Sequence, residues 1–383
     1  MDKHARRLLL LFSDTGGGHR SAAYAVAKTL QQLYGERAQI ELVDPLAEYA
    51  TRPFNRLDKL YPHMVRLRGW PWAAGYHLSD GPRRTALLMR SCCPLLHTAM
   101  LQLLRDHPAD VIVCCHALFS DPLLRTLTET GAATPLVTLV TDLIATHALW
   151  YVPGVNRCLV PTQHARQQAL ARGMPAEHIL VTGLPVGPHF TQAAQEDPRA
   201  MRQRLGLEPD QPVVLLVAGA EGMGPLHRLC RRVAYCGEQA QLVIIAGRNE
   251  RLRARLAAET WPTPVRVDGF VHNMHEWMRA ADLLVTKAGP GTISEALVMA
   301  LPMVLIDALP GQEQPNVDYV VQAGAGVWAP TPGQAAMAVY ELLSSDRSSL
   351  ERMRTRARAL AQPNAAQRVA EAVWATANEE LAR

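Results

Sequence analysis

The sequence predicts an α/β protein with two domains, each a parallel sheet covered by helices. Three observations support this fold class. The chain has 383 residues, more than one hydrophobic core usually organises. Apolar runs of strand length alternate with segments of helical periodicity. A polar stretch that begins at His189, HFTQAAQEDPRAMRQRLGL, divides these runs into two series.

Each series contains five strand-like runs. The first comprises Leu8–Phe12, Gln39–Val43, Val111–Cys115, Leu136–Thr141 and Cys158–Pro161. The second comprises Val213–Ala218, Leu242–Ala246, Val265–Asp268, Leu283–Lys287 and Met303–Ile306. Helical periodicity is clearest at Ser21–Leu33 and Glu295–Ala300. This alternation is typical of parallel sheets, whose carboxyl ends bind ligands.

Composition favours a globular protein in a reducing compartment. Hydrophobic residues make up 48% of the chain and charged residues 19%, which excludes disorder. The run Leu8–Phe12 is too short for a membrane span or a signal-peptide core, and no export signal is visible. The seven cysteines form no CxxC pair, which argues against a disulfide framework or a zinc site.

The net formal charge of +4 is unevenly distributed. Residues 1–187 carry 19 Lys/Arg against 14 Asp/Glu, a balance of +5, and the remainder carries −1. A solvated basic face, an anionic membrane surface or nucleic acid would each account for this excess. In the second half, RMRTRARALAQ near Arg352 forms a basic helix face.

The first glycine-rich turn, FSDTGGGHRSA, follows the first strand and opens the first helix. Gly16 to Gly18 allow a ligand to approach bare backbone, and His19 comes in the first helical turn. A histidine there can titrate near neutrality and act as a general base. The alternatives are a tight turn needed for packing and a surface or capping histidine.

The second glycine-rich turn, TKAGPGTISEAL, also joins a strand to a helix. Gly289 and Gly291 permit close backbone approach, and Pro290 stiffens the turn. The Thr292 hydroxyl could cap the helix or donate to a phosphate. Backbone N–H groups at such a helix start bind anions. Glu295, one turn further, could accept two sugar hydroxyls, or could simply complement the helix dipole.

Further polar residues follow the last strand-like run, in IDALPGQEQPN. Asp307, Gln312, Glu313 and Asn316 suit a polyhydroxylated ligand, although loop solubility would account for about half of them. The chain contains no Asp-x-Asp pair and no His/Cys cluster with ligand spacing. We therefore expect no metal, with any diphosphate stabilised by N–H groups, a helix dipole and a cation.

Together these segments resemble the monogalactosyldiacylglycerol synthases. That family belongs to a group with bacterial diacylglycerol glucosyltransferases and the N-acetylglucosaminyltransferase of peptidoglycan lipid assembly. The resemblance runs through most of the chain, in SDTGGGHRSAA, HPADVIVCCHAL, VTDLIATHALWYVPGVNRCLVPTQHARQQAL, ILVTGLPVGPHF, VDGFVHNMHEWMRAADLLVTKAGPGTISEAL and LPGQEQPNVDYVV. TKAGPGTISEAL and LPGQEQPN are specific to the group, and TDLIATHALWYVPGV is most similar to the galactolipid synthases.

The resemblance implies a GT-B fold, two Rossmann-like parallel-sheet domains facing a cleft. Residues 1–187 would bind the acceptor and the membrane, and residues 188–363 the UDP-sugar. A C-terminal helix at about 364–383 is expected to pack back on the first domain.

The resemblance also implies the binding residues for the donor. Phe270 and Val271 would meet uracil, Glu295 the ribose, and Gln312 and Glu313 the hexose. The full set implied for UDP-sugar binding is Gly18, Arg248, Phe270, Val271, Lys287, Gly289, Pro290, Gly291, Thr292, Ile293, Glu295, Gln312 and Glu313. Within this set, the turn from Gly289 to Ile293 would bind the diphosphate, with Arg248 as a further candidate.

The implied reaction is an inverting transfer of a hexose, galactose in the first instance, from a UDP-sugar to 1,2-diacylglycerol. By the same resemblance, His19 is the general base that polarises the acceptor hydroxyl. Asp142, which follows a strand in TDL, is its rival or its orienting partner, or is structural. The UDP-sugar is a substrate, and no cofactor is expected.

The segment between Tyr49 and Arg90 departs most from the family pattern. It interleaves basic residues with Trp70 and Trp72, which suits an anionic membrane interface, although a lid packed on the domain is an equal alternative. We assign Trp70, Trp72 and His147 to the acceptor and membrane side. The expected partners are UDP-galactose or UDP-glucose, diacylglycerol and anionic lipids, without nucleic acid. The expected location is cytoplasmic, peripheral on the inner face of the cell membrane.

Three alternatives remain open from the sequence. The enzyme could use UDP-glucose and make a glucolipid, since the two hexoses differ by one hydroxyl contact. It could be a nucleotide-sugar 2-epimerase acting on a soluble sugar. It could also be a non-catalytic scaffold recruited to membranes.

Overall fold

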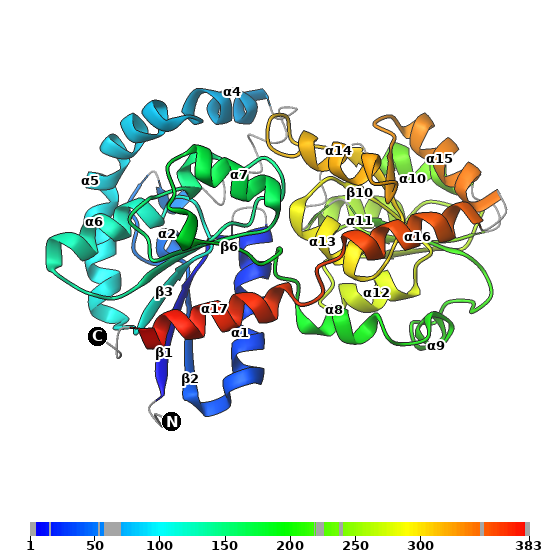
Figure 1. Cartoon of the computed structure of the whole chain (residues 1–383). Helices are drawn as coiled ribbons and strands as arrows, with labels where there is room; N and C mark the ends of the chain where they lie inside the picture. The colour runs from blue at the N-terminus through cyan, green and yellow to red at the C-terminus, as the bar shows by residue number, and fades with distance from the viewer. Residues whose placement is uncertain are drawn as a thin grey trace. The chain divides into compact units, whose positions relative to one another are not determined.

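The computed structural model describes residues 5–14, 17–52, 54–56, 70–217, 219, 226–236, 240–344 and 348–379. The chain forms two compact units (Figure 1). Unit 1 comprises Met1–Pro188, Pro310–Gln312 and Asn364–Arg383, and unit 2 comprises His189–Leu309 and Glu313–Pro363. Each unit contains one six-stranded sheet. All strand pairs in both sheets are parallel, so the predicted α/β class with two parallel-sheet domains is confirmed.

The sheet of unit 1 has the strand order β2-β1-β3-β4-β5-β6. Its strands are β1 (Arg6–Leu11), β2 (Ala38–Val43), β3 (Val111–Cys114), β4 (Leu136–Leu139), β5 (Arg157–Val160) and β6 (Ile179–Val181). Its helices are α1 (Gly18–Tyr34), α2 (Pro45–Glu48), α4 (Trp70–Ser79), α5 (Pro82–Asp106), α6 (Ser120–Thr130), α7 (Gln163–Ala171) and α17 (Ala365–Glu379).

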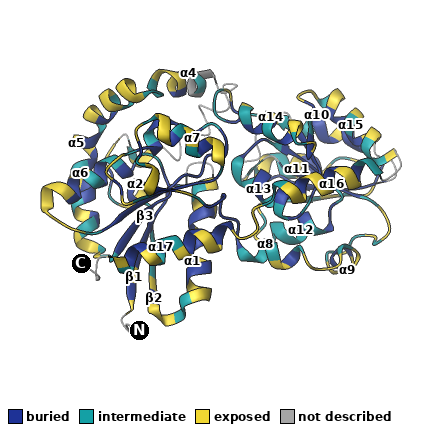
Figure 2. Cartoon of the chain, in the orientation of Figure 1, coloured by how far each residue is buried: buried dark blue, intermediate teal, exposed yellow. Residues whose placement is uncertain are grey.

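Both faces of the unit 1 sheet are covered by helices, which explains why its central strands β3 and β4 are buried at every position. Successive residues of β1 point to opposite faces. Leu8 and Leu10 pack in a core with α1 and α17, whereas Leu9 and Leu11 pack in a second core with α5 and α6. Helices α1 and α17 lie side by side, although they come from the two ends of the chain (Figure 1). The central strands are buried, and exposed residues gather on the outer helix faces (Figure 2).

The sheet of unit 2 has the order β12-β11-β10-β7-β8-β9. Its strands are β7 (Val213–Val217), β8 (Gln241–Ile245), β9 (Val265–Asp268), β10 (Leu283–Lys287), β11 (Met303–Asp307) and β12 (Gly326–Trp328). Its helices are α8 (Pro188–Ala193), α9 (Pro198–Arg204), α10 (Leu226–Cys236), α11 (Glu250–Ala257), α12 (Met274–Ala280), α13 (Pro290–Val298), α14 (Gln314–Gln322), α15 (Pro332–Ser344) and α16 (Ser348–Leu360). Helices α10 and α15 pack together over one face.

The ten predicted strands all occur, but two edge strands, β6 and β12, were not predicted. Each has only three residues and at most one fully buried position, so neither shows the apolar run of a central strand. The predicted helix Glu295–Ala300 also differs, because α13 begins at Pro290. Proline has the φ value of a helical first residue, and its missing N–H costs nothing there.

Helix α5 is the one helix in the described ranges that is long and apolar enough to cross a membrane by length and composition. Of the most apolar 18-residue stretch of this helix, 33% is buried. The buried positions recur at intervals of three or four residues: Met89, Cys93, Leu96, Ala99, Met100 and Leu103. This periodicity is that of a helix whose inner face packs on a protein core.

We predict that Gly326→Ala destabilises the protein, whereas Gly333→Ala does not. A Cβ at Gly326 would lie 2.7 Å from Cγ1 of Val320 and 2.8 Å from the Met303 carbonyl oxygen. Strand β12 would have to shift, at a cost of about 1–3 kcal/mol. A Cβ at Gly333 meets nothing within 4 Å, so that variant should be neutral or slightly stabilising. Denaturant midpoints measure both, and equal midpoints would contradict the packing at β12.

Candidate active site

The first glycine turn lies between β1 and α1. Gly17 has φ 79° and is the N-cap residue of α1. This left-handed conformation favours glycine. A Cβ at Gly18 would meet no atom within 4 Å, so the backbone there is open to a ligand. Gly16, the first of the three predicted glycines, lies outside the described residues.

His19 is half-buried in the first turn of α1. Its Nδ1 lies 2.7 Å from the hydroxyl oxygen of Thr141, two residues beyond the end of β4. Its ring is edge-to-face with His116, which follows β3, at a centroid distance of 4.6 Å. Burial lowers the pKa of His19 to about 4, and a backbone hydrogen bond with Cys115 acts in the opposite direction. The imidazole is therefore neutral near pH 7 and can accept a proton.

Asp142 is buried beside this cluster and bonds to Trp150. Its Oδ2 accepts a 2.7 Å hydrogen bond from the indole Nε1 of Trp150. Burial raises the pKa of Asp142, and the hydrogen bond from Trp150 acts against this increase. The hydroxyl beside His19 belongs to Thr141, so the side chain that orients His19 in this structure is Thr141 rather than Asp142.

The predicted acceptor residue His147 is buried, and both its ring nitrogens have partners. Nδ1 accepts from the Leu149 N–H at 3.1 Å, and Nε2 lies 3.1 Å from the Ser79 hydroxyl. Its neighbour Ala148 donates to Asp80, which also forms two hydrogen bonds with Arg172. His147 thus fixes its loop to the end of α4. Trp70 and Trp72 lie in the first turn of α4, but their side chains are outside the described part of the structure.

In unit 2, the second glycine turn forms the start of α13. Gly289 is the N-cap residue and Pro290 and Gly291 follow, with no side-chain capping bond. Thr292, which the sequence offered as a cap, is already inside the helix. Ile293 is buried in the core. The first N–H groups of α13 are thus left for a ligand, and Gly291 has open space where a side chain would be.

A buried ion pair lies directly beneath this turn. Lys287 Nζ is 2.6 Å from Oε1 of Glu313, whose Oε2 accepts from the Leu309 N–H at 2.9 Å. A Cβ at Gly289 would lie 3.3 Å from the lysine nitrogen, so a larger residue would press on the pair. Asn316 is also buried, and its amide donates to the Ala288 carbonyl. Glu313 and Asn316 therefore support the turn.

Glu295 is half-buried one turn further along α13. Burial raises the pKa of its carboxyl group to about 8. Within the described residues its side chain has no hydrogen bond or ion pair. An unpaired, desolvated carboxyl group of this kind is stabilised by any ligand that donates hydroxyl groups to it.

Arg248 and Phe270 come together at the ends of β8 and β9. The guanidinium carbon of Arg248 lies 5.0 Å from the centroid of the Phe270 ring, and 45% of Phe270 is exposed. Val271 follows and is half-buried. Gln312 belongs to the segment Pro310–Gln312, which groups with unit 1, although the neighbouring Glu313 groups with unit 2.

Sequence reasoning overlooked Thr141, His116 and Gly219. Each follows a strand at the carboxyl edge of its sheet, and that shared position is the signal that could have identified them. Gly219 has φ 73° after β7, and a Cβ there would lie 3.4 Å from Cε of Lys287. In the described ranges, no group of three or more His, Cys, Asp and Glu side chains is arranged to hold a metal.

Comparison with known proteins defines the class first. A family model for the glycosyltransferase family 28 C-terminal domain matches residues 213–370. Two solved structures share the fold. Acinetobacter baumannii MurG has a TM-score of 0.60 and 17% identity, covering 97% of this chain and 99% of that one. The Neisseria meningitidis UDP-GlcNAc 2-epimerase bound to UDP-GlcNAc has a TM-score of 0.62 and 13% identity, covering 96% and 100%. The protein is a glycosyltransferase with a GT-B fold.

The family follows from closer relatives. A model for monogalactosyldiacylglycerol synthase matches residues 19–186. The probable monogalactosyldiacylglycerol synthase 2 of Oryza sativa subsp. japonica is 37% identical over 372 residues, which cover 94% of this chain and 78% of that protein. Synthase 2 of Arabidopsis thaliana is 36% identical over 375 residues, covering 95% and 79%. The chain belongs to the monogalactosyldiacylglycerol synthase family, which excludes the non-catalytic scaffold.

One expectation from the sequence is wrong. We expected a cytoplasmic protein on the inner face of the cell membrane. The plant relatives are named as chloroplastic enzymes, and this finding contradicts the expectation. Short apolar runs and reduced cysteines do not distinguish these compartments.

We predict that the stability of the protein falls with rising pH through Glu295. Its pKa is raised from 4.5 to about 8, so the folded state retains a proton that the unfolded state has lost. The stabilisation is complete below pH 4.5 and is lost as the pH rises through 8, by up to about 1.4 kcal/mol per pH unit. Glu295→Gln should remove this slope in denaturant titrations from pH 5 to 9.

The matched control is Glu341→Gln, at an exposed glutamate on α15. It should retain the wild-type dependence on pH. If Glu295→Gln and Glu341→Gln give the same curve, the carboxyl group of Glu295 is not desolvated.

Proposed function

We propose that this enzyme transfers galactose from UDP-galactose to the free hydroxyl of 1,2-diacylglycerol, with inversion and without a metal. The observation that carries the proposal is a neutral, desolvated imidazole, His19, at the carboxyl edge of the unit 1 sheet in a chain of this family. Its relatives are named as synthases of the corresponding galactolipid.

The donor site is proposed at the start of α13. Its uncapped N–H groups would hold the diphosphate, where one preorganised donor to a developing oxyanion is worth about 3–4 kcal/mol. The ammonium group of Lys287, fixed by Glu313, adds a positive charge next to Gly289. These groups supply the charge stabilisation that a divalent ion would otherwise provide. Glu295 would accept the ribose hydroxyls.

The uracil and the hexose would lie on either side of the diphosphate. Phe270, half exposed with Arg248 on its ring, offers an aromatic surface for the base. Gln312 remains the proposed contact for the hexose. Glu313 is 3% exposed and already bonded to Lys287 and the Leu309 N–H, so we now give it a positioning role.

His19 is the proposed base for the acceptor hydroxyl. The contact with Thr141 holds the ring in place, and the backbone hydrogen bond with Cys115 favours the imidazolium that forms on proton transfer. The sugar then leaves UDP as the acceptor oxygen attacks the anomeric carbon from the opposite face. The departing diphosphate gains charge at the start of α13.

The acceptor would be reached from a membrane surface through α4 and α5. Leu78, Leu87 and Leu95 are 72%, 67% and 58% exposed. Arg83 and Leu87 are four residues apart and therefore neighbour each other on the surface of α5, which also exposes Leu95. Exposed leucines beside arginines suit an anionic lipid surface, where each basic residue contributes about 1 kcal/mol.

The test of this function is a lipid-product assay with the purified full chain. Vesicles contain 1,2-diacylglycerol in neutral lipid alone or with anionic lipid, and the donor is UDP-galactose or UDP-glucose, in excess chelator. We expect a β-linked galactolipid, formed faster on anionic vesicles and unaffected by chelation. A glucolipid formed faster would favour the UDP-glucose alternative. Activity lost in chelator and restored by a divalent ion would exclude the metal-free mechanism.

We predict that His19→Ala lowers kcat by about 10²–10⁴-fold and leaves UDP affinity nearly unchanged, because the imidazole acts on the acceptor. His164→Ala, at an exposed histidine of α7, is the matched control and should retain full turnover. In the wild type, kcat/KM should fall on acidification only near pH 4, since burial holds the pKa of His19 at about 4. If His19→Ala kept most of its turnover, the base would be Asp142.

A further inference from the structure

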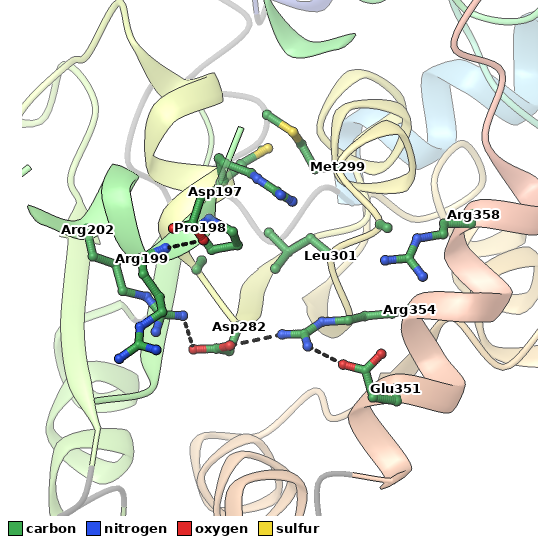
Figure 3. A pocket seen from close by; sticks show the side chains of 14 residues that line it. Asp197, Pro198, Arg199, Arg202, Asp282, Met299, Leu301, Glu351, Arg354 and Arg358 are labelled. Atoms are coloured by element: carbon green, nitrogen blue, oxygen red, sulfur yellow. Dashed lines mark hydrogen bonds and ion pairs between the residues drawn. The ribbon is translucent and has the colours of Figure 1, made fainter. Parts of the chain in front are cut away.

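A cavity of about 360 Å³ opens in unit 2 among α9, α12, the end of α13 and α16 (Figure 3). Asp282, which lines it, directly precedes β10, whereas the glycine turn follows the opposite end of that strand. The cavity is therefore at the amino edge of the sheet, away from the proposed donor site. A second cavity of about 230 Å³ shares five of its lining residues. Together they have the size of a small-molecule site.

The cavity has an apolar floor. Met278, Met299 and Leu301 contribute side chains that are each no more than 5% exposed overall. Between the last two, Ala300 has φ 52°, the only non-glycine residue with positive φ in the described ranges. This conformation turns the chain sharply at the end of α13. The floor can therefore receive the apolar part of a ligand.

Arginines dominate the walls. The five that line the cavity are Arg199, Arg202, Arg279, Arg354 and Arg358. The carboxylates are Asp197, Asp282 and Glu351, so the lining carries an excess of two positive charges.

Three of the five arginines are neutralised by carboxylates. Arg202 and Arg354 each form an ion pair with one carboxylate oxygen of Asp282, at 2.6 Å and 2.9 Å. Arg199 pairs with Asp210 outside the larger cavity. These pairs fix the wall. The remaining lining carboxylate, Asp197, accepts from the Arg199 and Ala200 N–H groups at the start of α9 and forms no ion pair with Arg279 or Arg358 within the described residues.

Arg279 and Arg358 form no ion pair within the described residues. The Arg279 side chain donates to the Glu196 carbonyl, at 2.6 Å, and the Arg358 guanidinium has no hydrogen-bond partner there. The pKa of Arg279 is lowered by burial and by the positive charges of Arg354 and Arg358, with Asp197 acting in the opposite direction. Figure 3 shows Arg358 extending from α16 toward the space in front of Leu301. Two guanidinium groups without an ion pair thus face one cavity, which also contains the carboxylate of Asp197.

We infer that this cavity binds an organic phosphate monoester, with the phosphate held by Arg279 and Arg358 and the organic part on the apolar floor. A phosphate monoester carries a charge of about −1.5 to −2 at pH 7 and three acceptor oxygens. Its charge matches two neighbouring guanidinium groups better than that of a single carboxylate does. Guanidinium groups from two helices can each donate in parallel to phosphate oxygens. Arg358, which would contact this phosphate, belongs to the basic helix face that the sequence shows near Arg352.

The test uses calorimetric titration of the full chain with n-butyl phosphate and, separately, with inorganic phosphate. We expect one site, with n-butyl phosphate binding more tightly because its chain covers the floor. Arg358→Met and Arg279→Met should each weaken binding about tenfold. Arg358→Met is the decisive variant, because within the described residues the Arg358 guanidinium forms no hydrogen bond or ion pair whose loss would weaken the fold.

Two controls separate this site from other phosphate binding. Arg352→Met removes the same charge from α16 at a residue that bonds only within its own helix, and it should bind like the wild type. Gly291→Val obstructs the glycine turn and should also retain n-butyl phosphate binding, whatever the outcome for the proposed donor site. Absence of saturable binding, equal weakening by Arg352→Met, or loss of binding in Gly291→Val would each overturn the inference.

Discussion

Parallel strand pairing is the constraint on which the rest of this structure depends. In a parallel sheet every strand ends at the same edge, so the residues that follow different strands meet there. In unit 1 this brings together His19, His116 and Thr141, which follow β1, β3 and β4, three neighbouring strands. In unit 2 it places Gly219 beside Lys287. Each helix that returns across the sheet also begins at this edge, which supplies N–H groups for anions.

Burial sets the protonation states at these edges. Desolvation disfavours charged forms, so it makes the imidazole of His19 neutral and raises the pKa of the Glu295 carboxyl group. Lys287 lies 2.6 Å from the buried carboxylate of Glu313, so the two side chains form an ion pair beside the turn. A neutral base and a fixed positive charge are what alcohol attack on a sugar diphosphate requires. Burial thus influences both the proposed base in unit 1 and the proposed donor site in unit 2.

The two anion sites proposed for unit 2 lie at opposite edges of one sheet and use different groups to bind the anion. At the carboxyl edge, backbone N–H groups of α13 and one paired lysine are available, which suits a diphosphate that must arrive and depart. At the amino edge, Arg279 and Arg358 face a cavity with an apolar floor. Since β10 separates the two sites, a ligand at one need not exclude a ligand at the other.

The sequence by itself determined the fold class, the family and the positions of both glycine turns. Continuous apolar runs indicate strands that are buried on both faces. Glycines directly after them indicate turns at which a side chain would obstruct the backbone. It did not reveal β6 and β12, because short edge strands lack that apolar signal. Only the tertiary structure decided that Thr141 contacts His19, that Glu313 is bonded to Lys287, and that Arg279 and Arg358 form no ion pair in the part of the chain that the structure describes. These are contacts between segments far apart in the chain, and periodicity or spacing along a sequence records nothing about which distant side chains meet.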